Sequence, residues 1–298
     1  MAELTRHIST SQGREQTTAL TGPPAWKRFV PERWYAHLIL WIACLVMGFP
    51  LLYAALVSTQ NNAQVANFVL APGTSFTDNL EWVMVNRNLG KYMVDSLTLS
   101  VVITVGKTIL SLLSGLAFVY FRFPGKWLVF GFVLLTLMMP TEILVIGLFR
   151  YVSGTLGWGG TFQAVAVPFL ASATGTFLFR QHFSNIPAEL SEAAQMDGAN
   201  PLQFLWRVLV PMSWNTIGAL AVIQFVYSWN MYLWPQLIMT RGDFQVVQVG
   251  LRALLGGDQA TEYGPLMLGA VIASIPPVIV FIILQKQFMS GFQITTDK

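Results

Sequence analysis

Long apolar runs separated by short polar segments dominate this chain of 298 residues. A helix needs about 20 apolar residues to cross the hydrocarbon core of a bilayer. By that criterion the pattern predicts six membrane-spanning helices, over residues 36–56, 95–121, 127–149, 161–181, 215–238 and 263–285. We therefore expect an all-α, polytopic integral membrane protein.

The composition excludes the soluble classes of protein. Only 10% of the residues are charged, against about 25% in an ordinary soluble domain, and 54% are hydrophobic. So few charges cannot cover a water-exposed surface, which argues against a soluble enzyme, a disordered protein and a nucleic-acid-binding protein. Cys44 is the one cysteine, and the histidines (His7, His37 and His182) are far apart, so we expect no disulfide and no metal site.

Lysine and arginine residues are distributed unequally between the two sides of the predicted spans. With the N-terminus inside, the inner segments carry Arg6, Arg14, Lys27, Arg28, Arg33, Arg122, Lys126, Arg180, Arg207, Lys286 and Lys298. The outer segments carry Arg87, Lys91, Arg150, Arg241 and Arg252. Because cytoplasmic loops are enriched in these residues, eleven against five favours both termini in the cytoplasm.

The same pattern divides the chain into four segments. These are a flexible cytoplasmic tail (1–33), a first transmembrane helix with its outer loop (34–90), a transmembrane domain (91–286) and a cytoplasmic C-terminus (287–298). The tail has no apolar run followed by a small-residue cleavage site, so we do not expect a signal peptide. Proline lacks a backbone N–H, so we expect kinks at Pro140 in the third span and at Pro276 and Pro277 in the sixth.

The longest inner loop, residues 182–214, carries the most detailed pattern. Asn185 is expected to cap a first short helix, with Pro187 in its first turn. Gly198 can take the left-handed conformation that ends a helix, and Asn200 can cap a second one. The second helix has apolar residues at helical spacing, namely Leu202, Leu205, Trp206 and Leu209.

The first helix of this loop has an acidic face that contains Glu189 and Glu192. Anionic lipid headgroups would repel such a face, whereas interfacial helices that rest on lipid are usually basic. We therefore expect the two helices to dock into a groove of a partner protein. Trp206 and Pro211 are expected to anchor the loop against the spans.

This loop resembles the EAA loop of bacterial ABC importer permeases. The matching positions are Glu192, Ala193, Ala194, Gly198 and Pro211 at the family's spacing, with Val208 and Val210 where the family usually has Ile and Leu. Three other segments agree with the sugar-type subfamily, most closely with its sn-glycerol-3-phosphate permeases: Phe121–Gly125, Phe177–Gln181 and Trp229–Pro235. The resemblance covers about residues 34–293 and implies the type I (MetI-like) permease fold, with cytoplasmic coupling helices between spans 4 and 5.

The resemblance also implies a division of labour in a bacterial inner membrane. This subunit would form half of a translocation pathway with a second, homologous permease. Two ATP-binding subunits would dock on the two EAA loops, here residues 185–211, and an external solute-binding protein would deliver the cargo. The implied coupling residues are Glu192, Ala193, Ala194, Asp197, Gly198 and Pro211.

No cofactor is expected in this chain. It contains no GxxxxGK[ST] phosphate-binding loop, so ATP and Mg²⁺ would be used by the partner subunits. The resemblance favours sn-glycerol-3-phosphate or a glycerophosphodiester as cargo, and an uncharged sugar or oligosaccharide is the alternative. Related permeases share one architecture across many solutes, so the cargo rests partly on analogy.

Lys107 is expected near mid-depth of the second span, where a lysine costs about 2.5–3.5 kcal/mol on insertion scales. Asp95 lies about 18 Å away along the same helix and cannot offset that cost. Lys107 therefore pairs with Glu142 in the third span, faces a cavity where it attracts an anionic substrate, or snorkels towards the interface. The first two hypotheses are not exclusive.

The fifth span carries polar side chains at membrane depth. Gln224 and Asn230 either bond a neighbouring helix or, together with aromatic walls, bind a polyol or sugar. The predicted substrate pathway consists of Lys107, Glu142, Gln224, Tyr227, Trp229 and Asn230. A rival hypothesis, an intramembrane enzyme, needs a nucleophile and a base at matching depth, and the spans offer no evident pair.

Overall fold

The computed structural model describes residues 34–239, 244–255 and 261–291, and within these ranges every regular element is a helix. The predicted tail, residues 1–33, and the last part of the predicted C-terminus, residues 292–298, lie outside the described residues. The prediction of an all-α protein is confirmed for the described part of the chain.

The chain divides into two compact units, residues 1–52 and residues 53–298. Helix α1 (Trp34–Val57) crosses the boundary between them. Its 24 residues are long and apolar enough to cross a membrane, which confirms the first predicted span. The divisions expected after residues 90 and 286 stay predictions.

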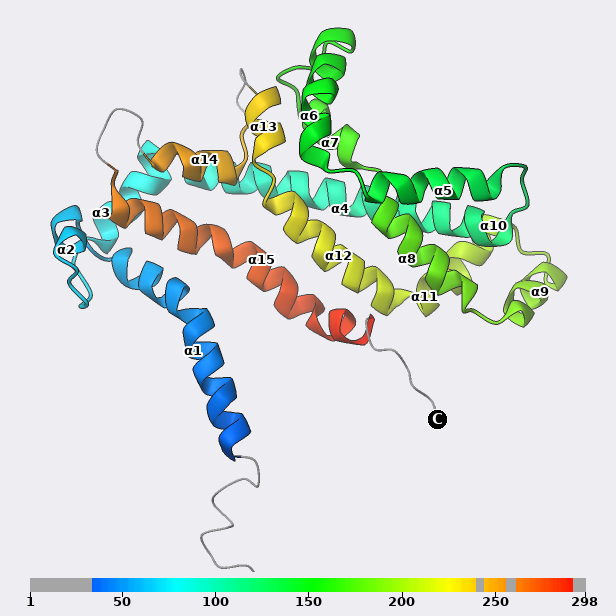
Figure 1. The fold of residues 1–298 in the computed structure, drawn as a ribbon, viewed down its shortest axis with the longest axis horizontal. Coiled ribbons are helices and arrows are strands. Elements are labelled where there is room, and N and C mark those ends of the chain that lie inside the picture. The colour runs from blue at the N-terminus through cyan, green and yellow to red at the C-terminus, as the bar shows by residue number, and fades with distance from the viewer. Residues whose placement is uncertain (1–33, 240–243, 256–260, 292–298) are drawn as a thin grey trace, which may run out of the picture. The chain divides into compact units, whose positions relative to one another are not determined.

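Four helices form the centre of the second unit (Figure 1). They are α4 (Leu89–Tyr120), α8 (Ala173–Ser184), α12 (Trp214–Trp229) and α15 (Tyr263–Gly291). Helix α12 packs against both α4 and α15, and α8 packs against α4. Gly115 permits one of these contacts, because a Cβ atom there would lie 2.7 Å from the Cβ atom of Phe179 on α8. Small residues let helices approach closely in membrane proteins.

Three further predicted spans are confirmed as helical segments long and apolar enough to cross a membrane. The spans predicted at 95–121 and 263–285 correspond to α4 and α15, and the span at 161–181 corresponds to Phe162–Ser184. This last segment consists of α7 (Phe162–Ala166), η4 (Val167–Phe169) and α8.

The prediction of one continuous helix over residues 127–149 is wrong. Helix α5 (Lys126–Leu137) ends before Pro140, and α6 (Thr141–Phe149) turns away from it and continues into η3 (Arg150–Thr155) (Figure 1). Proline cannot donate a backbone hydrogen bond and disfavours the helical conformation of the residue before it. The kink expected at Pro140 is therefore a full break.

The span predicted at 215–238 is also interrupted. Helix α12 has 16 residues and ends at Trp229, with Asn230 as its C-cap, and α13 (Leu233–Ile238) follows. It reaches the length of a membrane span only together with the segment Pro201–Met212, from which it is bent by 82°. The 82° bend thus lies at the end of the predicted loop, and α12 covers only the first part of the predicted span.

Short helices connect these long ones at the end where α4 begins (Figure 1). They are α2 (Asn62–Ala66), α3 (Phe76–Glu81), η2 (Trp82–Asn86) and α14 (Val247–Leu254). Buried Asn79 holds this region together, because its side-chain amide donates to the carbonyl oxygens of Ser58 and Gln60 at 2.9 and 3.0 Å.

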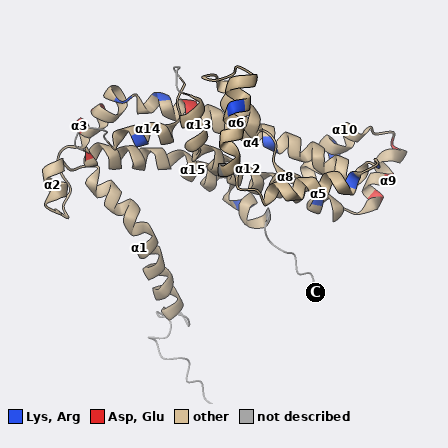
Figure 2. Ribbon diagram, turned by 45° about the horizontal axis from the view of Figure 1, so that its top comes forward, with Lys and Arg blue, Asp and Glu red and all other residues tan. Residues whose placement is uncertain are grey.

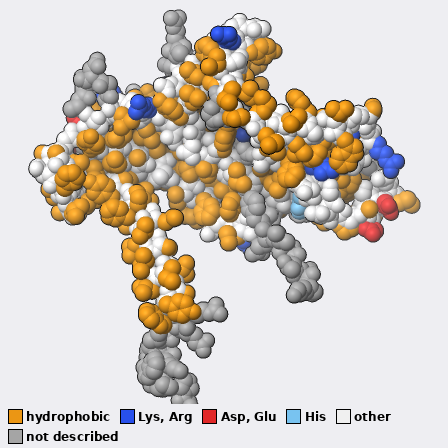
Figure 3. Space-filling model, in the orientation of Figure 1, with side chains coloured by type: hydrophobic (Ala, Val, Ile, Leu, Met, Phe, Trp, Pro, Cys, Tyr) orange, Lys and Arg blue, Asp and Glu red, His pale blue; other side chains and the backbone are white. Residues whose placement is uncertain are grey.

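Hydrophobic side chains cover large areas of the surface of the second unit (Figure 3). A monomeric soluble protein rarely exposes so much contiguous apolar surface. This surface suits contact with lipid or with other membrane subunits.

Candidate functional site: the 182–214 loop and the Lys107 cluster

The 182–214 loop contains α9 (Ala188–Met196), which ends in a tight turn at Gly198. Gly198 has a φ of +73°, and its N–H donates to the carbonyl oxygen of Gln195 at 3.0 Å. The N–H of Ala199 donates to the carbonyl oxygen of Ala194 at 2.9 Å. These two bonds form a Schellman motif, which satisfies the last carbonyls of the helix. The prediction that Gly198 ends the first helix is confirmed.

The second helix of the loop begins with a capping box. The Asn200 side chain accepts from the N–H of Gln203 at 2.8 Å, and the Gln203 side chain accepts from the N–H of Asn200 at 2.9 Å. Pro201 occupies the first position of α10 (Pro201–Phe204), where its missing N–H is harmless. The predicted cap is confirmed, and the turn between the helices is fixed from both sides.

The cap predicted for the first helix is wrong. Asn185 is the C-cap residue of α8, and its side chain caps nothing in α9. Pro187 itself precedes α9 in an extended conformation, with a ψ of 134°. The residue before a proline is disfavoured in a helix, which keeps Ile186 outside α9 and moves the helix start to Ala188.

The apolar stripe predicted for the second helix is half correct. Leu205 and Leu209 are buried, but Leu202 and Trp206 are exposed, Trp206 to 53%. Residues Leu205–Leu209 form the π-helical turn η5, and the N–H of Val210 bonds Leu205, five residues back. The wider turn rotates the buried face away from the 3.6-residue period. Trp206 therefore does not anchor the loop against this subunit.

Phe204, and not Trp206, anchors the loop against the rest of this subunit. It is buried, and its ring meets that of Tyr120 at the end of α4 edge to face, with 5.1 Å between centroids. The same cluster joins Leu205 and Leu209 to Phe179 and Phe183 of α8. The loop is thus packed directly on the ends of α4 and α8, so a force on the loop reaches both helices.

The predicted coupling residues lie on the outer surface of this loop. Glu192, Ala193, Asp197, Gly198 and Pro211 are exposed, and Ala194 is half-buried. Acidic side chains gather on α9 (Figures 2 and 3). The short alanine side chains leave the backbone of α9 open to close approach by another surface.

Lys107 is buried at the contact between α4 and α12, with 6% of its surface exposed. Its ammonium group donates to Oε1 of Gln224 at 2.9 Å and lies 4.5 Å from the centre of the Tyr227 ring. A cation over an aromatic face is attracted to the negative ring quadrupole. The structure therefore brings together three of the six residues predicted for the substrate pathway.

Gln224 connects this contact to a third helix. It is 5% exposed, and its amide group donates to Oγ of Ser172 at 3.2 Å. Ser172 is the N-cap of α8 and accepts from the N–H of Gly175 at 3.0 Å. The Lys107 cluster, which consists of Lys107, Gln224, Tyr227 and Ser172, thus joins α4, α12 and α8.

The Lys107 cluster forms part of a polar stripe along α4. Spaced by three or four residues, the stripe consists of Ser96, Ser100, Thr104, Lys107, Ser111 and Ser114. The hydroxyl groups of Ser100, Thr104 and Ser111 are buried without a hydrogen-bond partner in the described part of the chain. These groups keep free hydrogen-bonding capacity on both sides of Lys107.

Tyr227 separates Lys107 from the surface of the second unit. Its side chain is 43% exposed, whereas the lysine beneath it is buried. The partly exposed ring of Tyr227 therefore lies over the buried ammonium group of Lys107.

Trp229 and Asn230 lie outside the Lys107 cluster. The buried indole N–H of Trp229 donates to the carbonyl oxygen of Ala273 at 3.1 Å. In a regular helix that carbonyl would accept from the backbone N–H of residue 277, but Pro277 has no N–H. Helix α15 runs through both prolines as one helix. Trp229 thus satisfies a carbonyl that Pro277 leaves free, and this contact favours a packing role.

Asn230 is exposed and accepts from the side chain of Gln248 at 3.1 Å.

Glu142 lies on α6, and its side chain is outside the described residues, so its pairing with Lys107 stays a prediction. Asp95 accepts from the N–H of Gln245 at 3.2 Å. Asp95 therefore contacts the segment before α14, in agreement with the expectation that it cannot pair with the charge of Lys107.

Residues 107–292 match the family model described as "Binding-protein-dependent transport system inner membrane component". This match covers more than half of the chain. The chain belongs to this family. It is therefore a membrane transport component, the permease of an ABC importer, that works with a binding protein and an ATPase.

The relatives of this permease agree with that assignment. It is 35% identical over 272 residues to the sn-glycerol-3-phosphate transport system permease protein UgpE of Brucella melitensis, with 88% of this chain and 96% of the relative covered. It is 35% identical over 266 residues to the protein of the same name from Pectobacterium atrosepticum, with 86% and 94% covered. A chain of a bacterial ABC transporter that imports the acidic polysaccharide alginate has the same fold, with a TM-score of 0.72, 21% identity and coverage of 90% and 99%.

These matches confirm the predicted family and fold class of the permease. Its relatives are transport subunits, so the prediction of a transport subunit is confirmed and the rival hypothesis of an intramembrane enzyme is wrong. The family name also confirms the predicted location in a membrane.

The polar stripe of the permease was missed in the sequence, although a signal was present. Ser100, Thr104 and Ser111 recur at the same helical spacing as Lys107 within an apolar span. Ser172 gave no comparable signal, because its role depends on the contact between α8 and α12.

Proposed function

We propose that this permease forms half of the translocation pathway for sn-glycerol-3-phosphate or a glycerophosphodiester. The single observation that carries the proposal is Lys107, a buried cation that contacts only neutral groups within the described part of the chain. An anion that enters a low-dielectric pathway needs a positive counter-charge, because its desolvation is otherwise costly. The names of the relatives, which specify sn-glycerol-3-phosphate, support the same cargo.

The Lys107 cluster supplies the groups that such a cargo needs. Gln224 and Ser172 can donate to phosphate or glycerol oxygens, and Tyr227 can move aside to admit them. In the proposed pathway, Glu142 lies on the same route, and Trp229 and Asn230 border it. An uncharged sugar could bond to the amide and hydroxyl groups, but it has no anionic group to pair with the charge of Lys107.

The exposed coupling residues of the 182–214 loop are proposed to bind an ATP-binding subunit. The acidic face of α9 and the close approach permitted by Ala193 support docking into a partner's groove. In the complete importer, a second homologous permease, two ATP-binding subunits and an extracytoplasmic solute-binding protein would complete the assembly. Closure of the ATPase pair would then move α4 and α8 through Phe204.

The orientation of the permease is a separate prediction. Both termini are expected in the cytoplasm, because eleven lysine and arginine residues lie on that side and five on the other. Reporter fusions after residue 60 or 250 should give the signal of the outer face, and fusions at 195 or 298 that of the inner face. An outer signal from residue 195 would contradict both the topology and the docking role of α9.

Transport by the whole importer tests the proposed function. A tagged permease is purified with the subunits that accompany it and reconstituted with its binding protein in proteoliposomes. ATP-dependent uptake of labelled sn-glycerol-3-phosphate is expected, with competition by a glycerophosphodiester and not by a neutral disaccharide. Uptake of the disaccharide without uptake of the phosphate ester would contradict the proposal.

A further inference from the structure

Three cationic side chains lie close together beside the 182–214 loop, outside the Lys107 cluster. Arg122 follows the end of α4, Lys126 begins α5, and Arg180 lies on α8. The ammonium group of Lys126 donates to the carbonyl oxygen of Phe121 at 3.0 Å, which satisfies the end of α4. Burial lowers the pKa of Lys126, and the charges of Arg180 and Arg122 lower it further. The three positive charges therefore repel one another.

Aromatic rings hold one of these cations in place. The guanidinium carbon of Arg180 lies 4.3 Å from the centre of the Phe130 ring and 5.0 Å from that of Trp127. Stacking on rings orients a guanidinium group but does not neutralise it. The charge of Arg180 therefore remains available to an anion.

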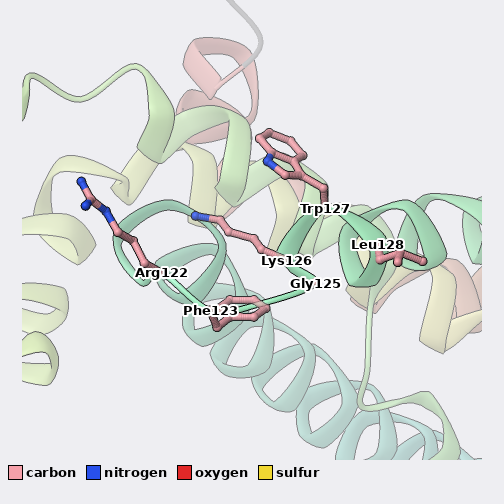
Figure 4. Close-up of a pocket in the computed structure, with 6 residues that line it drawn as sticks. All are labelled: Arg122, Phe123, Gly125, Lys126, Trp127 and Leu128. Carbon is pink, nitrogen blue, oxygen red and sulfur yellow. The ribbon is translucent and has the colours of Figure 1, made fainter.

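An open pocket of about 440 Å³ lies at this place (Figure 4). It is lined by Arg122, Phe123, Gly125, Lys126, Trp127 and Leu128. Figure 4 shows the charged ends of Arg122 and Lys126 on the same side of the connecting loop. Among the described residues, no carboxylate lines the pocket, so its cations have no acidic partner there in this part of the chain.

The surroundings of this basic pocket are apolar. Trp127 and Leu128 are exposed, Leu128 to 81%, and the exposed face continues along α5 with Val129, Phe132 and Leu135. Tryptophan at the edge of an apolar helix marks the level of the lipid headgroups. A ligand of this site thus meets positive charge at one end and a hydrocarbon-like surface at the other.

We propose that the basic pocket binds the phosphate headgroup of an anionic phospholipid, with its acyl chains along the exposed face of α5. Basic pockets between transmembrane helices recognise such headgroups through their charge. Free phosphate would have no use for the apolar face, and an ATP-binding subunit would have to approach Trp127 and Leu128 within the membrane boundary. The lipid lies in the leaflet nearest to α9, because the pocket adjoins the ends of α4 and α8.

The whole importer complex in detergent tests this proposal. The complex is incubated with equimolar phosphatidylglycerol and phosphatidylethanolamine, and the bound lipids are counted by native mass spectrometry. Phosphatidylglycerol is expected to be retained in preference. The double variant Arg122→Gln/Arg180→Gln should lower that preference about twenty-five-fold, at about fivefold for each charge removed.

Arg87→Gln is the matched control. The guanidinium group of Arg87 also lies over a tryptophan ring, 4.6 Å from the centre of Trp82, but outside the basic pocket and before the start of α4. This variant should keep the preference for phosphatidylglycerol. Its loss in Arg87→Gln would show that total charge, rather than the basic pocket, selects the lipid, and would overturn the proposal.

Other outcomes also decide between the possible ligands. Equal retention of both lipids, or displacement of phosphatidylglycerol by inorganic phosphate, would overturn the proposal. Loss of the ATP-binding subunits from the double variant with unchanged lipid retention would assign the pocket to protein docking instead. If the double variant does not assemble, the wild-type complex still serves: salt raised from about 0.05 to about 0.5 M should release phosphatidylglycerol selectively, and no release contradicts an electrostatic site.

Discussion

Replacement of Lys107 by methionine is expected to lower the uptake of a phosphorylated cargo at least about tenfold, with the importer still assembled. Methionine keeps the length of the apolar part of the side chain and removes the charge, so the packing of α4 against α12 should largely survive. The barrier for the anion should rise, because its desolvation without a counter-charge costs several kcal/mol. Uptake in proteoliposomes and the amount of complex in the membrane are measured together.

Ser100→Ala is the matched control for Lys107→Met. Ser100 lies on the same stripe of α4 and is also buried, but its hydroxyl group makes no hydrogen bond in the described part of the chain. Its replacement should leave uptake nearly unchanged. A similar loss in both variants would show that any change in the stripe disturbs packing, and the proposed role of the charge would then be wrong.

A structural role of Lys107 predicts a different result. If the lysine serves mainly to pair with Glu142, Lys107→Met should destabilise the subunit, and Glu142→Gln should partly restore it by removing the unpaired charge. The thermal stability of the purified complex separates this case from the pathway hypothesis. Normal uptake with normal assembly in Lys107→Met would contradict both.

Replacement of Gly198 by valine is expected to abolish transport and weaken the attachment of the ATP-binding subunits, while the permease still reaches the membrane. A Cβ atom at this position would meet nothing within 4 Å, so space is available. The backbone is the obstacle, because φ is +73° and a left-handed conformation costs a non-glycine residue about 1–2 kcal/mol. A β-branched residue is least able to adopt it, so the turn and the position of α10 should change.

Gly198→Asn is the control for this prediction. Asparagine tolerates the left-handed conformation and should keep a substantial part of transport and ATPase attachment. Co-purification of the ATP-binding subunits and the rate of uptake are measured for both variants. Transport at the normal rate by Gly198→Val, with the ATP-binding subunits attached, would contradict the docking role of the loop. Glu192 is expected to be required in the same way.

Local signals in the sequence were sufficient to predict much of the structure of the 182–214 loop. The Schellman turn at Gly198 and the capping box at Asn200 involve residues within five positions of one another, so their chemistry is visible in a short window. The stripe over Leu205 and Trp206 was predicted less well. A single π-helical turn shifts the buried face, and the apolar spacing alone does not reveal that turn.

The sequence by itself determined the class of this protein, because apolar runs of about 20 residues and a lack of charge permit few structures other than membrane helices. It also identified Lys107 as a charge that needs a partner. The tertiary structure alone decided which groups meet that charge. Gln224 lies 117 residues from Lys107 and Ser172 lies 52 residues from Gln224, so only the packing of α12 against α4 and α8 brings them together. In the same way, Arg180 of α8 reaches the rings of α5 beside the basic pocket through a contact between separate helices, which no spacing along the chain encodes.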